Sequence, residues 1–303
     1  MNTKSFMRAL ALAAVMLLAC GDCVGKAPSN VPAPSVQTVQ GDTVEVMSQA
    51  MGRAIKNTVI VPQIYFDEKL PDARYPVLYL LHGAYGDYSN WAHKVDLDAI
   101  ASRYRVIIVC PDGQDSWYFD SPVDPKMQFE TYISKELVAY IDSHYRTQAN
   151  RYMRAITGLS MGGHGALYLA WRHPDVFWSC GCMSGGVDIT KYPDKWHIKD
   201  RLGEQADNQQ RWHDNAVTNM VGLLKDSKLE PAQNIIIDDG LDDIFIKDNI
   251  ELHDKLVAAG IDHDFTVRPG RHTWDYWVNS LDYHMVFFAK VFARGAELIN
   301  AKP

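Results

Sequence analysis

Hydrophobic positions along the chain follow an alternation of strand and helix patterns from about residue 43 onward. Two early runs, 44–46 and 56–62, alternate apolar with polar or β-branched residues, which is typical of half-buried strands. Apolar runs typical of buried inner strands follow at 76–81, 105–110, 154–157, 176–183 and 234–237, and a last strand is expected at 263–267.

Helical periodicity or helix-forming composition separates these strands. Helices are expected at 91–103, 129–146, 163–173, 249–259 and from about 274 through 292. Residues 187–230 lack strand character, so we expect a helical insertion there. Strands that alternate with helices in this way predict an α/β fold with a mostly parallel central sheet and helices on both faces.

The N-terminus has the pattern of a targeting segment. Lys4 and Arg8 precede an apolar stretch, 9–19, that is too short to span a bilayer. It leads into Leu-Leu-Ala-Cys-Gly at 17–21, which resembles a bacterial lipobox. We therefore expect a lipoprotein-type signal peptide at 1–19, lipid attachment at Cys20, and a flexible tether at 20–41.

This segment predicts an exported protein, a bacterial lipoprotein at the outer membrane or in the periplasm, with plain secretion as the alternative. Membrane contact is then expected only through the N-terminal lipid. The 303 residues are 47% hydrophobic and 22% charged with a net charge of −7, a composition typical of a globular protein. With the N-terminal segment set apart, we expect one globular domain over 42–303. It supplies no basic face, so nucleic acid is excluded as the main partner.

Cysteines outside the N-terminal segment lie in apolar runs without metal-ligand spacing. Cys110, Cys180 and Cys182 are expected to be small buried hydrophobes. We expect neither a metal site nor a cofactor.

Residues 158–162, Gly-Leu-Ser-Met-Gly, match G-x-S-x-G between a predicted strand and a predicted helix. This sharp turn exposes a serine hydroxyl at the edge of an α/β sheet, so Ser160 is the candidate nucleophile. The amide of Met161, at the start of the helix, would face a developing oxyanion. A second amide is expected from the glycine-rich loop after 76–81, with Ala84 nominated by position and Tyr85 as the alternative.

A general base and an acid are needed because a serine hydroxyl is a poor nucleophile at neutral pH. His272 directly follows the last predicted strand, whereas His263 precedes that strand and His253 lies within a helix. The acid is expected in the carboxylate-rich loop after 234–237, where Asp242 and Asp243 compete ahead of Asp238 and Asp239. Spacing alone does not choose among them.

Aromatic residues near these strand ends are candidate substrate contacts: Tyr85, Trp117, Tyr118 and Trp274. Hydrophobic packing is the alternative for Trp117, Tyr118 and Trp274. His82 is expected to anchor its loop and not to act as a catalyst. His197 and His213 lack the partner spacing of a metal site and are expected to be surface or structural residues.

The order serine, acid, histidine is that of the α/β-hydrolase fold. The motifs resemble the putative-esterase branch, which includes the esterase D group and feruloyl and acetyl-xylan esterases of carbohydrate esterase family one. They are Leu80-Leu81-His82-Gly83 with Gly86 and Trp91, Gly158-Leu159-Ser160-Met161-Gly162-Gly163, Gly240-Leu241-Asp242-Asp243 and Gly270-Arg271-His272-Thr273-Trp274.

The resemblance implies that the acid is Asp243 and that the oxyanion amides are those of Ala84 and Met161. Arg271 departs from the small residue that many members carry, which is expected to reshape the rim of the site. The implied activity is a serine carboxylic-ester hydrolase acting through an acyl-enzyme, with feruloyl or acetyl esters of plant polysaccharide, or small esters, as substrates. Alternatives are an acyltransferase to a sugar hydroxyl, a thioesterase like S-formylglutathione hydrolase, and a non-catalytic carbohydrate-binding lipoprotein.

Overall fold

The computed structural model describes residues 41–301. The predicted signal peptide at 1–19, the predicted lipid attachment at Cys20 and the tether up to residue 40 lie outside the described residues. None of the helices within residues 41–301 combines the length and apolar character that crossing a membrane requires.

A single sheet with the strand order β1-β2-β4-β3-β5-β6-β7-β8 forms the centre of the fold. The strands are β1 (Asp42–Ser48), β2 (Arg53–Ile60), β3 (Val77–Leu81), β4 (Ile107–Pro111), β5 (Arg154–Leu159), β6 (Ser179–Met183), β7 (Asn234–Gly240) and β8 (Asp264–Arg268). From β4 to β8 all neighbours are parallel, whereas β2 pairs antiparallel with both β1 and β4. The predicted mostly parallel sheet is confirmed.

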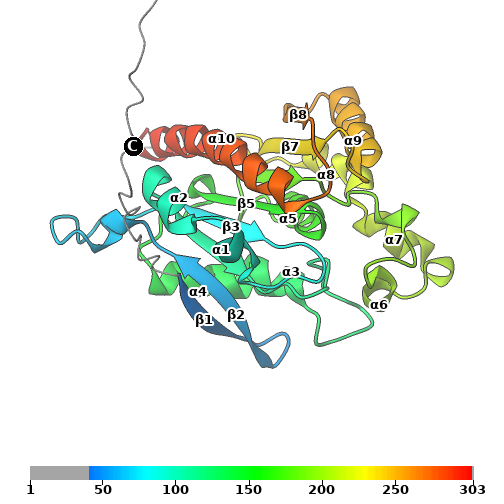
Figure 1. Ribbon diagram of the computed structural model, residues 1–303, viewed down its shortest axis with the longest axis horizontal. Helices are drawn as coiled ribbons and strands as arrows, with labels where there is room; N and C mark the ends of the chain where they lie inside the picture. The colour runs from blue at the N-terminus through cyan, green and yellow to red at the C-terminus, as the bar shows by residue number, and fades with distance from the viewer. Residues whose placement is uncertain (1–40, 302–303) are drawn as a thin grey trace, which may run out of the picture. The chain divides into compact units, whose positions relative to one another are not determined.

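Helices cover both faces of this sheet (Figure 1). They are α1 (Asn90–Lys94), α2 (Leu97–Tyr104), α3 (Phe129–Thr131), α4 (Val138–His144), α5 (Met161–Arg172), α6 (Ile198–Leu202), α7 (Gln209–Asn215), α8 (Val221–Asp226), α9 (Ile246–Ala259) and α10 (Trp274–Asn300). Side chains of α1, α2 and α10 pack with one face of the inner strands, and side chains of α4, α5 and α9 pack with the other.

Side chains along the inner strands alternate between the two faces of the sheet, and both faces are buried because the side chains on each are apolar. In β3, Tyr79 and Leu81 belong to the core on the α5 side, while Leu78 and Leu80 belong to the core on the α10 side. The three internal cysteines are unpaired and buried among these residues, as predicted. Burial raises the pKa of the Cys110 and Cys180 thiols, so they act as small apolar side chains.

Two predicted helices differ in detail from those observed. The helix expected at 91–103 is divided into α1 and α2, because Val95 is extended and the Asp96 carboxylate accepts a 2.9 Å hydrogen bond from the amide of Ala99. Asp96 therefore caps the second helix. The helix expected at 129–146 contains a π-helical stretch, Tyr132–Leu137, between α3 and α4.

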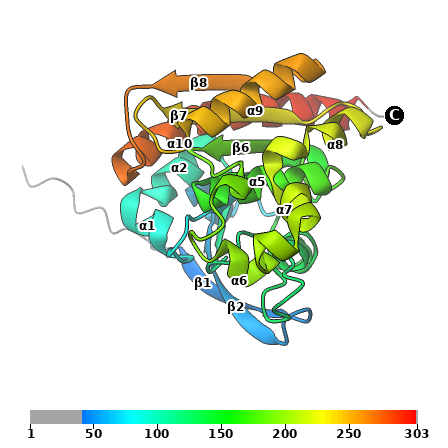
Figure 2. The same cartoon turned by 90° about the vertical axis from the view of Figure 1, so that its right-hand side faces the viewer.

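Residues 187–230 contain the short helices α6, α7 and α8 joined by 3-10 turns. Figure 2 shows α6 and α7 side by side, and Figure 1 places them beyond the carboxyl ends of the strands. The segment is held by buried residues such as Ile198, Trp212 and Val217, which belong to the same core as α5. It lies on the side of the sheet edge where ligands of α/β proteins bind.

Glu130 ties α3 to the helix that follows Ser160. Its carboxylate accepts hydrogen bonds from the Tyr168 hydroxyl at 2.7 Å, from Arg172 Nε at 2.8 Å and from His173 Nε2 at 2.8 Å. Burial raises the pKa of Glu130, but these three hydrogen bonds together outweigh burial and lower it from 4.5 to about 2.

Glu130→Gln is therefore expected to lower the free energy of unfolding by about 3 kcal/mol at pH 7. The ionised carboxylate stabilises the folded state above the unfolded pKa near 4.5, and this contribution is lost as the pH falls toward 2. Urea unfolding of both proteins between pH 7 and pH 3 measures the difference. A difference that stays constant across this range would contradict the assignment.

Candidate active site

Ser160 lies on a tight turn between β5 and α5. It has φ 56° and ψ −116°, a strained conformation for a residue with a side chain, and its amide donates to the Met183 carbonyl at 2.9 Å. The turn leaves the side chain half-buried at the carboxyl end of a central strand. Strain at this position is typical of a residue held for function.

Glycines on both sides of the serine are required by close backbone approach. A Cβ on Gly158 would lie 2.6 Å from the Gly162 carbonyl oxygen, and a Cβ on Gly162 would lie 2.6 Å from the His82 carbonyl oxygen. No side chain fits at either position, which explains the glycines of the G-x-S-x-G pattern.

A continuous hydrogen-bond relay joins Ser160, His272 and Asp243. His272 Nε2 lies 3.0 Å from Ser160 Oγ, and His272 Nδ1 lies 3.0 and 2.9 Å from the two carboxylate oxygens of Asp243. Asp243 follows β7 and His272 follows β8, so adjacent parallel strands bring both to the edge where β5 delivers the serine. The Asp243 side chain is fully buried, whereas 21% of the His272 side chain remains exposed.

The other three carboxylates of this loop have different surroundings. Asp238 Oδ2 lies 2.6 Å from Arg268 Nη2 on the α10 side of the sheet. Asp239 accepts from Asn249 Nδ2 at 2.9 Å and from its neighbouring amide, on the α9 side. The Asp242 side chain is 70% exposed, and its nearest cation is 3.9 Å away. Of the four candidates, only Asp243 contacts the histidine.

Asp239 lies close enough to Asp243 for their charges to interact. Burial, and after it the negative charge of Asp243, raises the pKa of Asp239 well above its usual value. Their mutual repulsion therefore favours the protonated form of Asp239, whose carboxyl group faces Asn249 and not His272.

Phe245 and Trp277 hold the His272 ring from two sides. Both contact it edge to face, with ring centroids 5.2 and 4.8 Å away, and the Phe245 amide donates to Asp243 Oδ1 at 2.9 Å. The sequence gave no sign of these roles, because neither the loop position of Phe245 nor the helical position of Trp277 shows which side chain it will contact.

Two backbone amides are available for an oxyanion. The amides of Met161 and Ala84 donate no hydrogen bond to any residue within 41–301. Met161 begins the twelve-residue α5, so its amide is among those that a helix leaves unpaired. The loop of Ala84 passes beside the serine, since a Cβ on Gly83 would lie 3.3 Å from Ser160 Cβ.

The alternative donor, Tyr85, is already engaged: its amide donates to Asp115 Oδ1 at 2.6 Å. This bond also fixes the residue after Ala84. His82 anchors the same loop, because the Gly113 amide donates to its Nε2 at 2.8 Å and its Nδ1 donates to the Gly83 carbonyl at 2.8 Å. Burial lowers the pKa of His82, which keeps this ring neutral.

The structure corrects two of the expected aromatic contacts. Tyr118 is fully buried, packs against Gly165 and donates its hydroxyl to the His82 carbonyl at 2.9 Å. Trp117 is also buried and donates to the Trp196 carbonyl of the insertion at 2.8 Å. Both side chains therefore support loops and do not reach solvent, so the packing interpretation describes them.

Tyr85 and Trp274 remain accessible beside the triad. Tyr85 is 69% exposed and its ring meets that of His197 at 5.9 Å. Trp274 is half-buried against Trp91, with ring centroids 5.2 Å apart. Arg271, the residue that departs from the family pattern, has a 77% exposed side chain at this rim.

Three further histidines, His213, His253 and His263, have their partners outside the relay. His213 is exposed and contacts Asp214, and His253 and His263 hydrogen-bond each other at 2.8 Å. Within residues 41–301, no three His, Cys, Asp or Glu side chains are grouped as metal ligands. The arrangement of Ser160, His272 and Asp243 beside two unpaired amides is suited to nucleophilic acyl transfer.

Comparisons with known proteins agree with this chemistry. The sequence model of a family described as Putative esterase matches residues 48–288. An acetyl esterase of Caldicellulosiruptor saccharolyticus is 27% identical over 240 residues, which are 73% of this chain and 89% of that protein. An S-formylglutathione hydrolase of Rattus norvegicus is 27% identical over 217 residues, 65% of this chain and 74% of that protein.

Among solved structures, a ferulic acid esterase is similar to this chain with a TM-score of 0.71 and 28% sequence identity. The match covers 83% of this chain and 97% of the other. The similarity therefore extends over nearly the whole of that protein.

Proposed function

The chain belongs to the Putative esterase family, and on that basis we propose that it removes feruloyl or acetyl groups from plant polysaccharide or related small esters. It is a serine ester hydrolase. The observation that carries the mechanism is the unbroken relay from Ser160 Oγ through His272 to the Asp243 carboxylate.

Acylation begins when Ser160 Oγ attacks the ester carbonyl carbon and His272 Nε2 takes the hydroxyl proton. The amides of Met161 and Ala84 stabilise the oxyanion of the tetrahedral intermediate, each contributing about 3 kcal/mol. The intermediate collapses, the bond to the alcohol oxygen breaks, and His272 gives its proton to the departing alcohol. The acyl group is then bonded to Ser160 Oγ.

Deacylation repeats these steps with water in place of the alcohol. His272 takes a proton from the water as its oxygen attacks the acyl carbon, and the collapse returns that proton to Ser160 and releases the acid. Asp243 accepts from Nδ1 in both halves, which fixes the histidine tautomer and stabilises the imidazolium.

The choice of acyl group is supported by two relatives, the acetyl esterase and the ferulic acid esterase. The accessible rings of Tyr85 and Trp274 also support it, because aromatic rings stack on phenolic acyl groups and on sugars. The predicted export signal, with Cys20 as lipid attachment, supports a substrate outside the cytoplasm.

A thioesterase acting on S-formylglutathione is the second candidate. It is favoured by the relative of that name and requires the same relay. The predicted export signal argues against this activity, because glutathione thioesters are hydrolysed in the cytosol.

A comparison of substrates tests the proposal. We expect kcat/KM for methyl ferulate or for acetylated xylan to exceed that for S-formylglutathione by at least about tenfold, or about 1.4 kcal/mol. The purified protein is assayed with these substrates and p-nitrophenyl acetate side by side, and Ser160→Ala reveals any contaminating activity. A tenfold preference for S-formylglutathione would overturn the substrate assignment and leave the relay intact.

A further inference from the structure

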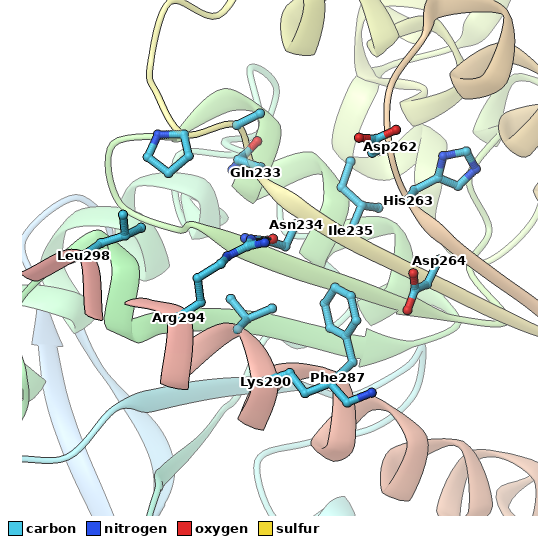
Figure 3. Close-up of a pocket in the computed structure, with 13 residues that line it drawn as sticks. Gln233, Asn234, Ile235, Asp262, His263, Asp264, Phe287, Lys290, Arg294 and Leu298 are labelled. Carbon is cyan, nitrogen blue, oxygen red and sulfur yellow. Dashed lines mark hydrogen bonds between the residues drawn. The ribbon is translucent and has the colours of Figure 1, made fainter. Parts of the chain in front are cut away.

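An open cavity of about 730 Å³ lies far from the triad, where β7 and β8 begin beside the C-terminal half of α10 (Figure 3). Asn234 and Asp264 are the first residues of strands whose opposite ends lead to Asp243 and His272. Because the seven residues of β7 span roughly 20 Å, the cavity and the relay lie at opposite edges of the sheet.

Charged side chains of both signs border the cavity without neutralising each other. Lys290 and Arg294, one turn apart on α10, lie on one side, and Asp262 and Asp264 come from the segment that enters β8 (Figure 3). Between residues 41 and 301, no ion pair joins these two bases to these two acids, and Lys290 has no hydrogen-bond partner. Arg294 donates to Asn234 Oδ1 and stacks on Trp178.

These groups define the chemistry of a matching ligand. Carboxylates only accept hydrogen bonds, and ammonium and guanidinium groups only donate them. A hydroxyl does both at one atom, so a ligand with closely spaced hydroxyls can bond to the acids and the bases at once. The two acids and the two bases sum to zero net charge although they are not paired, so the lining favours a ligand without net charge over a simple anion or cation.

The floor of the cavity is apolar. Phe287 is half-buried there, with Ile235 and Val291 buried beside it. His263 adds little polarity, because one ring nitrogen bonds to His253 and the other to the Ile261 carbonyl. A polar rim over an aromatic and aliphatic floor suits a pyranose, which has hydroxyls at its edge and C–H groups on its faces.

We propose that this cavity is a second binding site that holds a neutral glycan chain. A volume of about 730 Å³ lies within the range of about 300–1,000 Å³ for small-molecule sites and is sufficient for a short oligosaccharide. Glycan binding here goes beyond the proposed esterase function, because it uses none of the triad. The effect of glycan binding on the hydrolysis of a polymer does rest on the proposed esterase function. The site would keep acylated polysaccharide bound to the protein between turnovers.

Isothermal titration of the full chain with xylohexaose or cellohexaose tests the site. We expect saturation by at least one hexaose below about 10 mM, and Asp264→Ala and Lys290→Ala each to weaken binding about fivefold or more. Asp282→Ala, which removes an exposed carboxylate of α10 outside the cavity, is the matched control and should bind as the parent does. Circular dichroism checks that each variant is folded.

The same variants should hydrolyse p-nitrophenyl acetate at the parent rate and lose activity only on acetylated xylan. If neither hexaose binds, or if binding survives the Asp264→Ala/Lys290→Ala double variant, the proposal is overturned. Binding of glycylglycine in place of the hexaoses would also overturn it, because the ligand would then be a zwitterion. Hexaose binding without any esterase activity would refute the proposed function alone.

Discussion

Ser160→Ala is expected to lower kcat for a short-chain ester by roughly 10⁶-fold, because no other group in the relay can form the acyl-enzyme. Removing the hydroxyl leaves the oxyanion amides and the substrate contacts in place, so a residual rate of about 10³–10⁴ over water should remain. Hydrolysis of p-nitrophenyl acetate by the purified variant measures the loss.

The fold should survive this substitution, since alanine at φ 56° is no more strained than serine and the side chain is only half-buried. Ser143→Ala, at an exposed serine on α4, is the control for the chemical change alone. Turnover by Ser160→Ala within tenfold of the parent would contradict the assignment of Ser160 as the nucleophile.

Asp243→Asn is expected to lower kcat by about 10⁴-fold with little change in KM. The asparagine amide would donate to His272 Nδ1, where the carboxylate now accepts at 2.9 Å. The imidazole would then carry its proton on Nε2, pointing at Ser160, and could no longer accept the serine proton. Steady-state kinetics with p-nitrophenyl acetate separate the effect on kcat from that on KM.

Asp242→Asn provides the matched control one residue away. Its side chain is 70% exposed and does not contact His272, so kcat should stay within about twofold of the parent. Equal losses in both variants would mean that the loop, and not the Asp243 carboxylate, supports catalysis.

Much of the site followed from the sequence because buried strands are easy to recognise. Continuous apolar runs located the strands, and the residues directly after them had to meet at one edge of a parallel sheet. Ser160 and His272 could therefore be paired although 112 positions separate them. The glycines around the serine carried a second, independent signal, which the close approaches at Gly158 and Gly162 explain.

The acid could not be chosen from spacing, because four carboxylates lie within six residues. Successive side chains at the end of β7 point to opposite faces, so Asp238 meets Arg268 and Asp239 meets Asn249. Only resemblance to the esterase family favoured Asp243 over Asp242 beforehand. The direction of a side chain at the end of a strand depends on the residue at which the strand ends. Sequence patterns locate that residue only to within a few positions.

The contacts with distant residues that hold the loops in place could not be predicted from the sequence either. Asp115 holds the Tyr85 amide from 30 residues away, and Tyr118 fills the space above Gly165. Adjacent aromatic residues at a strand end have the same pattern whether they face a ligand or the core. Burial, which only the folded chain reveals, decides between these roles.

The most direct test of the relay is to trap its covalent intermediate. The parent protein and Ser160→Ala are treated with a fluorophosphonate, digested, and mapped by mass spectrometry. We predict a single adduct on the peptide that contains Ser160, absent from the variant, with loss of esterase activity in proportion to labelling. Full labelling of another residue, or complete inhibition without an adduct on Ser160, would contradict the account.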